Sequence, residues 1–135
     1  VEFGATEVVA ERGEAGVARV FDLTDGLGVD AALECVGTDE SMRTALDLVR
    51  PGGRIGFVGV PHDVSVPIEE LFGRNVRIGG GVAPVREYLP ALRDLVLAGQ
   101  IHPGRVFDLT LPLADVAEAY AAMDQRRATK AMLLP

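Results

Sequence analysis

The 135-residue sequence has no tryptophan, one cysteine and two histidines, and only 5% of its residues are aromatic. The single cysteine, Cys35, excludes a disulfide within the chain, and with two histidines it also excludes a self-contained Cys/His zinc site. No apolar run approaches the roughly 18 residues that cross a bilayer, and no basic segment precedes a signal-like stretch. We therefore expect a soluble, cytoplasmic protein.

Positive charge is also scarce. Thirteen Lys and Arg residues stand against 20 Asp and Glu residues, which gives a formal net charge of −7. Proteins that bind duplex DNA or anionic membranes present a basic face. The charge therefore predicts neither a nucleic-acid partner nor a membrane partner.

Apolar stretches typical of strands alternate with stretches whose apolar residues recur every three or four positions. The predicted strands are Glu7–Ala10, Val29–Val36, Arg54–Val60, Asn75–Gly79, Val106–Leu109 and Met132–Leu134. The predicted helices are Ala15–Leu23, a segment capped by Thr38 or Asp39 that ends before Arg50, a short segment Ile68–Phe72, Val85–Leu97 and Leu113–Met123. Strands separated by single helices predict parallel crossovers, and hence an α/β fold with a doubly wound, mostly parallel sheet.

Three predicted strands carry glycine at their carboxyl ends. The segments are Val36-Gly37, Val58-Gly59-Val60-Pro61 and Gly79-Gly80-Gly81-Val82. Any one of these glycines can serve only the turn from strand to helix. Ligands of open parallel sheets bind at the carboxyl ends of strands, and three such segments together indicate a flat ligand that the backbone approaches closely.

Five motifs occur in a specific order: GATEVV, DGLGVDAALECVG, LVRPGGRIGFVGVP, NVRIGGG and LPLADVAEAYAAM…KAMLLP. Together they resemble the C-terminal half of a zinc-dependent alcohol dehydrogenase of the medium-chain dehydrogenase/reductase family, over essentially the whole chain. The GLGVD and ECVG motifs resemble the alcohol, polyol and threonine dehydrogenase branch of that family. The zinc-free quinone reductases more often show an Asp-Ser-Val-Gly type of turn.

Several features of that family are missing from the sequence. It has no G-x-G-x-x-G loop for the pyrophosphate, no acidic residue after a second strand, and no catalytic domain with zinc ligands. The resemblance implies that residues 1–135 form the C-terminal portion of a Rossmann-like NAD(P)-binding domain, a partial Rossmann fold without the catalytic domain and the first strands. We expect no catalytic residue and no metal ligand here, and an isolated chain that is inactive.

The resemblance also assigns roles at two of the glycine segments. It places Val36 and Gly37 beside the adenosine half of the cofactor. It places Val58, Gly59 and Val60 at the nicotinamide-side turn, whose peptide groups hydrogen-bond the carboxamide and fix which face of the ring meets the substrate.

The third glycine segment and the chain's end receive roles in the same way. Gly80 and Val82 correspond to a segment with further carboxamide contacts, and Lys130 to a cation that reaches the pyrophosphate. Lys130 can equally be a solvated residue of a basic stretch. Cys35 is expected to be small and buried and not a nucleophile, and His62 is expected to lie in a solvated loop.

For the whole protein, the resemblance implies hydride transfer between an alcohol or polyol carbon and NAD or NADP, with zinc as the Lewis acid. The substrate would be a small-molecule alcohol or carbonyl compound. Two alternatives stay open: a zinc-free quinone or enoyl reductase, and a non-catalytic half-Rossmann binding module. Related dehydrogenases join two sheets across a two-fold axis, so we also expect a homodimer through the Asn75–Gly79 edge strand.

Overall fold

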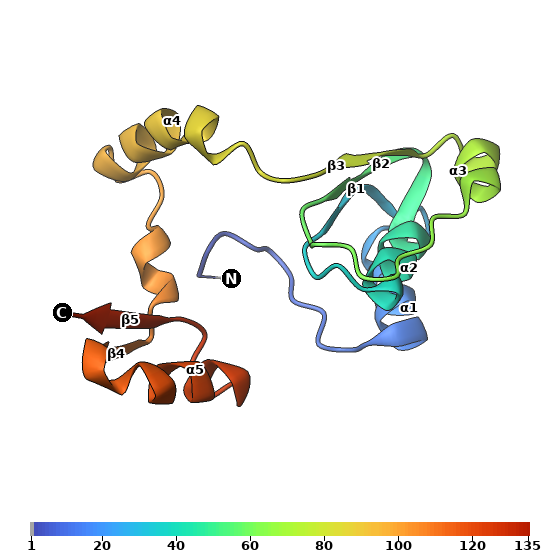
Figure 1. The fold of residues 1–135 in the computed structure, drawn as a ribbon. Helices are drawn as coiled ribbons and strands as arrows, with labels where there is room; N and C mark the ends of the chain where they lie inside the picture. The colour runs from blue at the N-terminus through green and yellow to red at the C-terminus, as the bar shows by residue number, and fades with distance from the viewer. Residues whose placement is uncertain (1) are drawn as a thin grey trace. The chain divides into compact units, whose positions relative to one another are not determined.

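The computed structural model describes residues 2–135, which form two compact units that meet in sequence between Pro84 and Val85 (Figure 1). The first unit contains α1 (Gly13–Leu23), β1 (Val29–Glu34), α2 (Asp39–Leu48), β2 (Val49–Phe57), α3 (Ile68–Arg74) and β3 (Arg77–Gly80). The second contains α4 (Val85–Leu97), β4 (Leu109–Pro112), α5 (Val116–Asp124) and β5 (Ala131–Leu134), with 3-10 turns at Pro103–Val106 and Leu113–Asp115. Among residues 2–135, no helix is long and apolar enough to cross a membrane.

The strands of the first unit form a parallel sheet in the order β1-β2-β3. Glu34 of β1 pairs with Phe57 of β2, and Phe57 pairs with Gly80 of β3, so the three strands end level with one another. The second unit has its own parallel pair, β4 and β5. The predicted α/β class with parallel strands is therefore confirmed.

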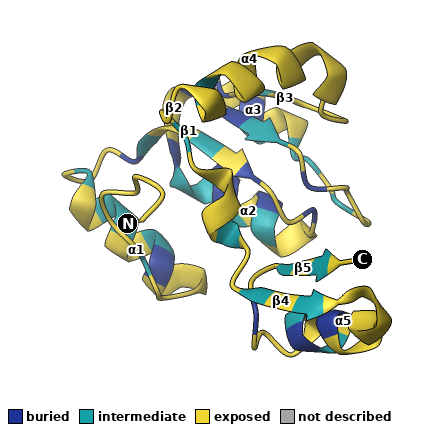
Figure 2. Ribbon diagram, turned by 90° about the vertical axis from the view of Figure 1, so that its left-hand side faces the viewer, coloured by how far each residue is buried: buried dark blue, intermediate teal, exposed yellow. Residues whose placement is uncertain are grey.

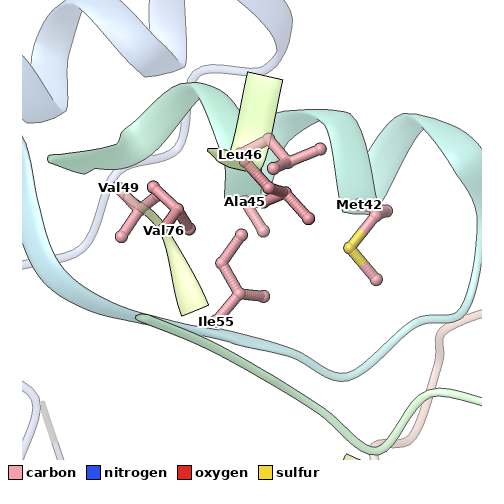
Figure 3. Close-up of a cluster of buried hydrophobic side chains, with 7 residues drawn as sticks. Met42, Ala45, Leu46, Val49, Ile55 and Val76 are labelled. Carbon is pink, nitrogen blue, oxygen red and sulfur yellow. The ribbon is translucent and has the colours of Figure 1, made fainter. Parts of the chain in front are cut away.

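Helix α2 begins at a capping box and covers one face of the three-stranded sheet. The Thr38 hydroxyl accepts a hydrogen bond from the Ser41 amide at 3.2 Å, and the Ser41 hydroxyl accepts one from the Thr38 amide at 3.1 Å. The spacing of Met42, Ala45, Leu46 and Val49 predicts that they face inward. All four are buried, and Figure 3 shows them beside Ile55 of the sheet. This core consists of Met42, Ala45, Leu46, Val49, Ile55, Leu71 and Val76.

The second unit buries much less apolar surface (Figure 2). Helix α4 has the predicted bounds, yet none of its residues is buried, and its apolar stripe of Val85, Leu89, Leu92 and Val96 is exposed. Helix α5 buries Ala119 and Ala122. The sequence spacing predicts one apolar side for this helix, with Val116, Ala119, Tyr120 and Met123. That prediction is only partly correct, because Tyr120 is exposed.

The N-terminal strand prediction is wrong. Residues 7–10 form no strand, although Val8 and Val9 have strand-like character. An isolated strand leaves its amides and carbonyls without a ladder, and no strand of residues 2–135 pairs with this segment.

Several strand boundaries also differ from the prediction. β1 and β2 end two and three residues earlier, at Glu34 and Phe57, because the residues that follow form turns. β3 begins at Arg77 because Asn75 adopts a left-handed conformation at the end of α3. The strand predicted at Val106–Leu109 occurs at Leu109–Pro112 instead.

Candidate functional site

Three turns leave the carboxyl edge of the β1-β2-β3 sheet. We call them the first turn (residues 35–38), the second turn (58–61) and the third turn (81–84). Because the strands are parallel and end level, all three turns lie at the same edge. This is the edge at which open parallel sheets bind their ligands.

The first and second turns contact each other backbone to backbone through two glycines. A β-carbon on Gly37, whose φ is +90°, would lie 2.1 Å from the Val60 carbonyl oxygen. A β-carbon on Gly59 would lie 2.3 Å from the Gly37 amide nitrogen. Any larger residue would force the turns apart, so the sequence of these turns is dictated by their close approach.

The valines that flank these buried glycines point to solvent. Val36, Val58 and Val60 are 67%, 60% and 69% exposed. The structure therefore brings together five of the predicted cofactor residues as a rigid backbone contact with an apolar outer surface. Exposed apolar residues gathered at one edge are typical of a surface that a ligand covers.

The third turn is tied to the second strand. Gly80 packs so closely on β2 that a β-carbon there would lie 2.0 Å from the Phe57 carbonyl oxygen, and the Gly81 amide donates to that oxygen at 3.2 Å. Val82, which follows, is 98% exposed. Gly80 and Val82 thus belong to the same edge as the other predicted residues.

Four amides of the first two turns are directed into the protein. Val36 and Gly37 donate to the Glu34 carboxylate at 2.7 and 2.8 Å, and Val58 and Gly59 donate to the Glu34 carbonyl oxygen at 2.9 and 3.4 Å. A ligand at this edge therefore cannot use these four amides as donors. The arrangement favours contacts with valine side chains and with backbone acceptors.

Sequence reasoning missed Glu34, which is buried at the end of β1. Its pKa is lowered, first by the Gly37 amide and further by the Ser41 hydroxyl and the Val36 amide, while burial opposes this effect. The carboxyl is therefore ionised at neutral pH. A signal was present in the sequence, because Glu34 interrupts an otherwise apolar strand.

Lys130 lies in the second unit, just before β5, and its side chain is exposed. Its amide donates to the Asp108 carboxylate at 3.2 Å, and its carbonyl accepts from the Asp108 amide at 3.2 Å. Hydrogen bonds from Thr129 and then from Lys130 lower the pKa of Asp108. The position of the Lys130 backbone is thus well fixed, and its role toward a cofactor stays a prediction.

The sequence also predicts whether Cys35 and His62 are exposed. Cys35 is exposed, so the prediction of a buried cysteine is wrong: β1 ends at Glu34, and Cys35 already belongs to the first turn. His62 lies in an exposed loop as predicted, and its amide donates to the Gly37 carbonyl at 3.0 Å.

Within residues 2–135, no group of three or more His, Cys, Asp or Glu side chains is placed to hold a metal ion. The side chains present therefore do not fit a zinc ion. We derive no step through zinc from this chain.

A parallel α/β sheet with close glycine turns at its carboxyl edge is typical of Rossmann-like folds. Comparison with known proteins makes the assignment specific, because a family described as zinc-binding dehydrogenase matches residues 1–98. The chain belongs to the zinc-binding dehydrogenase family.

Individual relatives agree with this assignment. The chain is 36% identical to a probable zinc-binding alcohol dehydrogenase of Mycobacterium tuberculosis, over 92% of this chain and 32% of the relative. It is also 36% identical to zinc-type alcohol dehydrogenase B of Aspergillus flavus, over 83% of this chain and 26% of that protein. The chain thus spans about a third or less of the length of these two relatives.

Solved structures of related enzymes share the fold of this chain. Alcohol dehydrogenase TADH from Thermus sp. ATN1 superposes with a TM-score of 0.87 and 32% identity, over 97% of this chain and 39% of that one. A quinone oxidoreductase of Pseudomonas syringae superposes with a TM-score of 0.67 and 25% identity, over 88% and 39% of the two chains.

Proposed function

We propose that the carboxyl edge of the β1-β2-β3 sheet binds NAD or NADP, and that the protein containing this chain is an alcohol dehydrogenase. One observation carries the proposal: two glycine turns in backbone contact hold Val36, Val58 and Val60 outward at the ligand-binding edge of a parallel sheet. The alcohol dehydrogenase names of the relatives support it.

The residues of this edge bind and orient. The exposed valines offer a flat apolar surface for the planar rings of a dinucleotide, and Val60 and Val82 are also suited to form part of the substrate wall. Because four amides of the first two turns are bonded to Glu34, backbone acceptors would receive the donors of a carboxamide or a ribose. Lys130 would supply a positive charge to the pyrophosphate.

When bound, the cofactor supplies the hydride chemistry at its nicotinamide ring. The chain's own contribution is to fix which face of the ring is presented and to exclude water from it. Among residues 2–135, no group of three or more His, Cys, Asp or Glu side chains could hold a metal ion for the reaction. We therefore propose that these 135 residues alone are inactive, and that zinc in the whole protein has ligands outside them.

The main alternative is a zinc-free quinone reductase, which the likeness to the Pseudomonas syringae enzyme supports. Zinc content and turnover distinguish the two. About one catalytic zinc per subunit in the protein that contains this chain, with alcohol oxidation, supports the dehydrogenase. An active metal-free protein supports the reductase, and a protein that binds cofactor without turnover of either substrate supports a non-catalytic module.

We also propose a homodimer through β3. In the order β1-β2-β3, this strand lies at the edge of its sheet and offers unpaired backbone groups. A second copy can pair with it across a two-fold axis. The cytoplasmic location stays a prediction from composition.

The proposed binding can be measured on the 135-residue chain. The sequence holds no glycine-rich pyrophosphate loop, so we expect NAD+ to bind with a dissociation constant above about 1 mM, equivalent to about 4 kcal/mol or less. In an NMR titration, the amides of residues 36–37, 58–60 and 80–82 should shift with NAD+ or NADP+. Micromolar binding contradicts the affinity prediction, and shifts confined to other residues contradict the site.

A further inference from the structure

Glu34 is a buried carboxylate that neither the fold nor the proposed chemistry explains. Its side chain is 4% exposed and reaches toward α2, where it contacts Ser41. Removing an ionised carboxyl from water is costly unless hydrogen bonds replace its solvation. An apolar residue at the end of β1 would extend the core of the unit without that cost.

Three donors converge on one oxygen of this carboxylate. Oε1 accepts from the Val36 amide at 2.7 Å, the Gly37 amide at 2.8 Å and the Ser41 hydroxyl at 2.7 Å. Hydrogen bonds to an ionised acceptor are shorter and about twice as strong as those between neutral groups. The amides of Val36 and Gly37 are therefore held in one orientation by a residue two and three positions before them.

The backbone of the same residue holds the second turn. The Glu34 carbonyl oxygen accepts from the Val58 amide at 2.9 Å and from the Gly59 amide at 3.4 Å. The side chain and main chain of Glu34 thus bond to both turns that carry the exposed valines.

Support of the helix alone does not explain the carboxylate. The Thr38 hydroxyl already caps α2 by accepting from the Ser41 amide, and the Ser41 hydroxyl returns a bond to the Thr38 amide. These two bonds complete the capping box without Glu34. The bonds that need the carboxylate are those to the amides of the first turn.

We propose that Glu34 is a positioning residue for the cofactor-binding edge, which holds the first turn through its carboxylate and the second turn through its backbone carbonyl. The inference rests on the proposed function, because it assigns a role in shaping the same edge. Glu34 does not touch the cofactor. It acts by directing four amides inward, which leaves the valine side chains outward.

The test compares variants of the 135-residue chain by NMR titration with NAD+ and by urea unfolding of the same samples. Glu34→Ala removes the carboxylate and should weaken NAD+ binding by about three- to tenfold, the equivalent of one or two lost hydrogen bonds. Glu34→Gln keeps an acceptor oxygen, so it should restore most of the affinity while the Val36 and Gly37 amide protons move upfield.

Two control variants separate positioning from stability. Glu70→Gln weakens the ion pairs that join α3 to α2 and leaves the amides of the first turn bonded, so it should lower the free energy of unfolding without changing NAD+ affinity. Glu40→Gln makes the same change in charge as Glu34→Gln, at an exposed position near the N-terminus of α2. It should change neither the free energy of unfolding nor the NAD+ affinity.

The proposal is overturned if folded Glu34→Ala binds NAD+ like the unaltered chain, or if Glu70→Gln weakens binding equally. If Glu34→Ala does not fold, unmoved Val36 and Gly37 amide protons in Glu34→Gln overturn it. If NAD+ shifts none of the edge amides in the unaltered chain, the proposed function fails. The positioning role is then decided by whether Glu34→Gln shifts the amides of Val36 and Gly37, which are the two amides bonded to the carboxylate.

Discussion

At the scale of single residues, the site depends on two glycines whose hydrogens face another turn's backbone. Gly59 has no positive φ, so its replacement is opposed by contact alone. We expect Gly59→Ala to lower the free energy of unfolding by about 1–3 kcal/mol, the usual cost of overpacking a well-packed site. Urea unfolding measures this change.

Gly73→Ala is the matched control, because Gly73 lies inside α3 with no atom within 4 Å of an added β-carbon. Alanine favours a helix interior over glycine by roughly 0.5–1 kcal/mol, so this variant should be unchanged or more stable. Equal losses in the two variants would show that the contact between the turns is not what requires glycine.

A second residue-scale prediction concerns Glu70, which joins α3 to α2. Its carboxylate accepts from Arg43 at 2.7 and 2.9 Å and from Arg74 at 2.8 Å. These bonds lower the pKa of Glu70 to about 2 from an ordinary value of 4.5, and the bonds from Arg43 have the largest effect. The folded state therefore binds fewer protons than the unfolded state between these values, and the stabilisation is lost as the pH falls from 4.5 to 2.

Glu70→Gln should accordingly be less stable than the unaltered chain at pH 6, by about 1 kcal/mol because the partners are partly exposed. The difference should shrink as the pH falls through that window. Glu69→Gln, the neighbouring exposed position in the same helix turn, should show no such convergence. A Glu70→Gln difference that is constant from pH 6 to pH 2 would contradict the assigned cause.

At the scale of elements, the sequence predicted helices better than strand ends. The bounds of α4 and the inward face of α2 follow from apolar periodicity, and both are confirmed. The residues after β1 and β2 are as apolar as the strands, so periodicity cannot reveal where each ladder stops. The stops are set by hydrogen bonds from the turn amides to Glu34, which join residues of two strands.

The same reasoning explains which site residues were predictable. The sequence itself shows valine next to glycine at the ends of two predicted strands. These residues are Val36, Gly37, Val58, Gly59 and Val60. Glu34 has a role only because Ser41 and the second turn converge on it. Such convergence depends on packing between segments and leaves no local pattern beyond one acidic residue in a strand.

The capping box gives an element-scale prediction. Thr38→Ala removes the hydroxyl that accepts from the Ser41 amide, and we expect a loss of about 1 kcal/mol in the free energy of unfolding. Compared with the unaltered chain, amide hydrogen exchange should be faster only in the N-terminal residues of α2. Thr44→Ala serves as the control, since the Thr44 hydroxyl bonds only the Glu40 carbonyl within the same helix. Equal effects of both variants would contradict a specific role for the cap.

At the scale of the whole molecule, the open question is what pairs with the edges of the three-stranded sheet. Both β1 and β3 have a free edge within the first unit. Parallel sheets are usually covered on both faces and paired along their strands. Of the two edges, β3 is the one at which we propose that a second copy pairs.

The hydrogen bonds of β3 identify the residue at which the dimer is best tested. The Gly81 amide donates to Phe57 of β2, and alternate residues of a strand direct their backbone groups to the same side, so the Ile78 amide faces the open edge. Val76 is unsuitable, because its amide donates to the Leu71 carbonyl at the end of α3. Proline at position 78 removes the amide donor that faces the open edge. The backbone groups of β3 that bond to β2 are kept.

We therefore expect light scattering at tens of micromolar to show a dimer for the unaltered chain and a monomer for Ile78→Pro. Ile78→Ala loses the half-buried side chain but keeps the amide, so it should be less stable and still dimeric. A monomeric unaltered chain contradicts the proposed assembly. A dimer that persists in Ile78→Pro excludes β3 as its interface, and because β1 has the other free edge of the sheet, the pairing would then have to be sought there first.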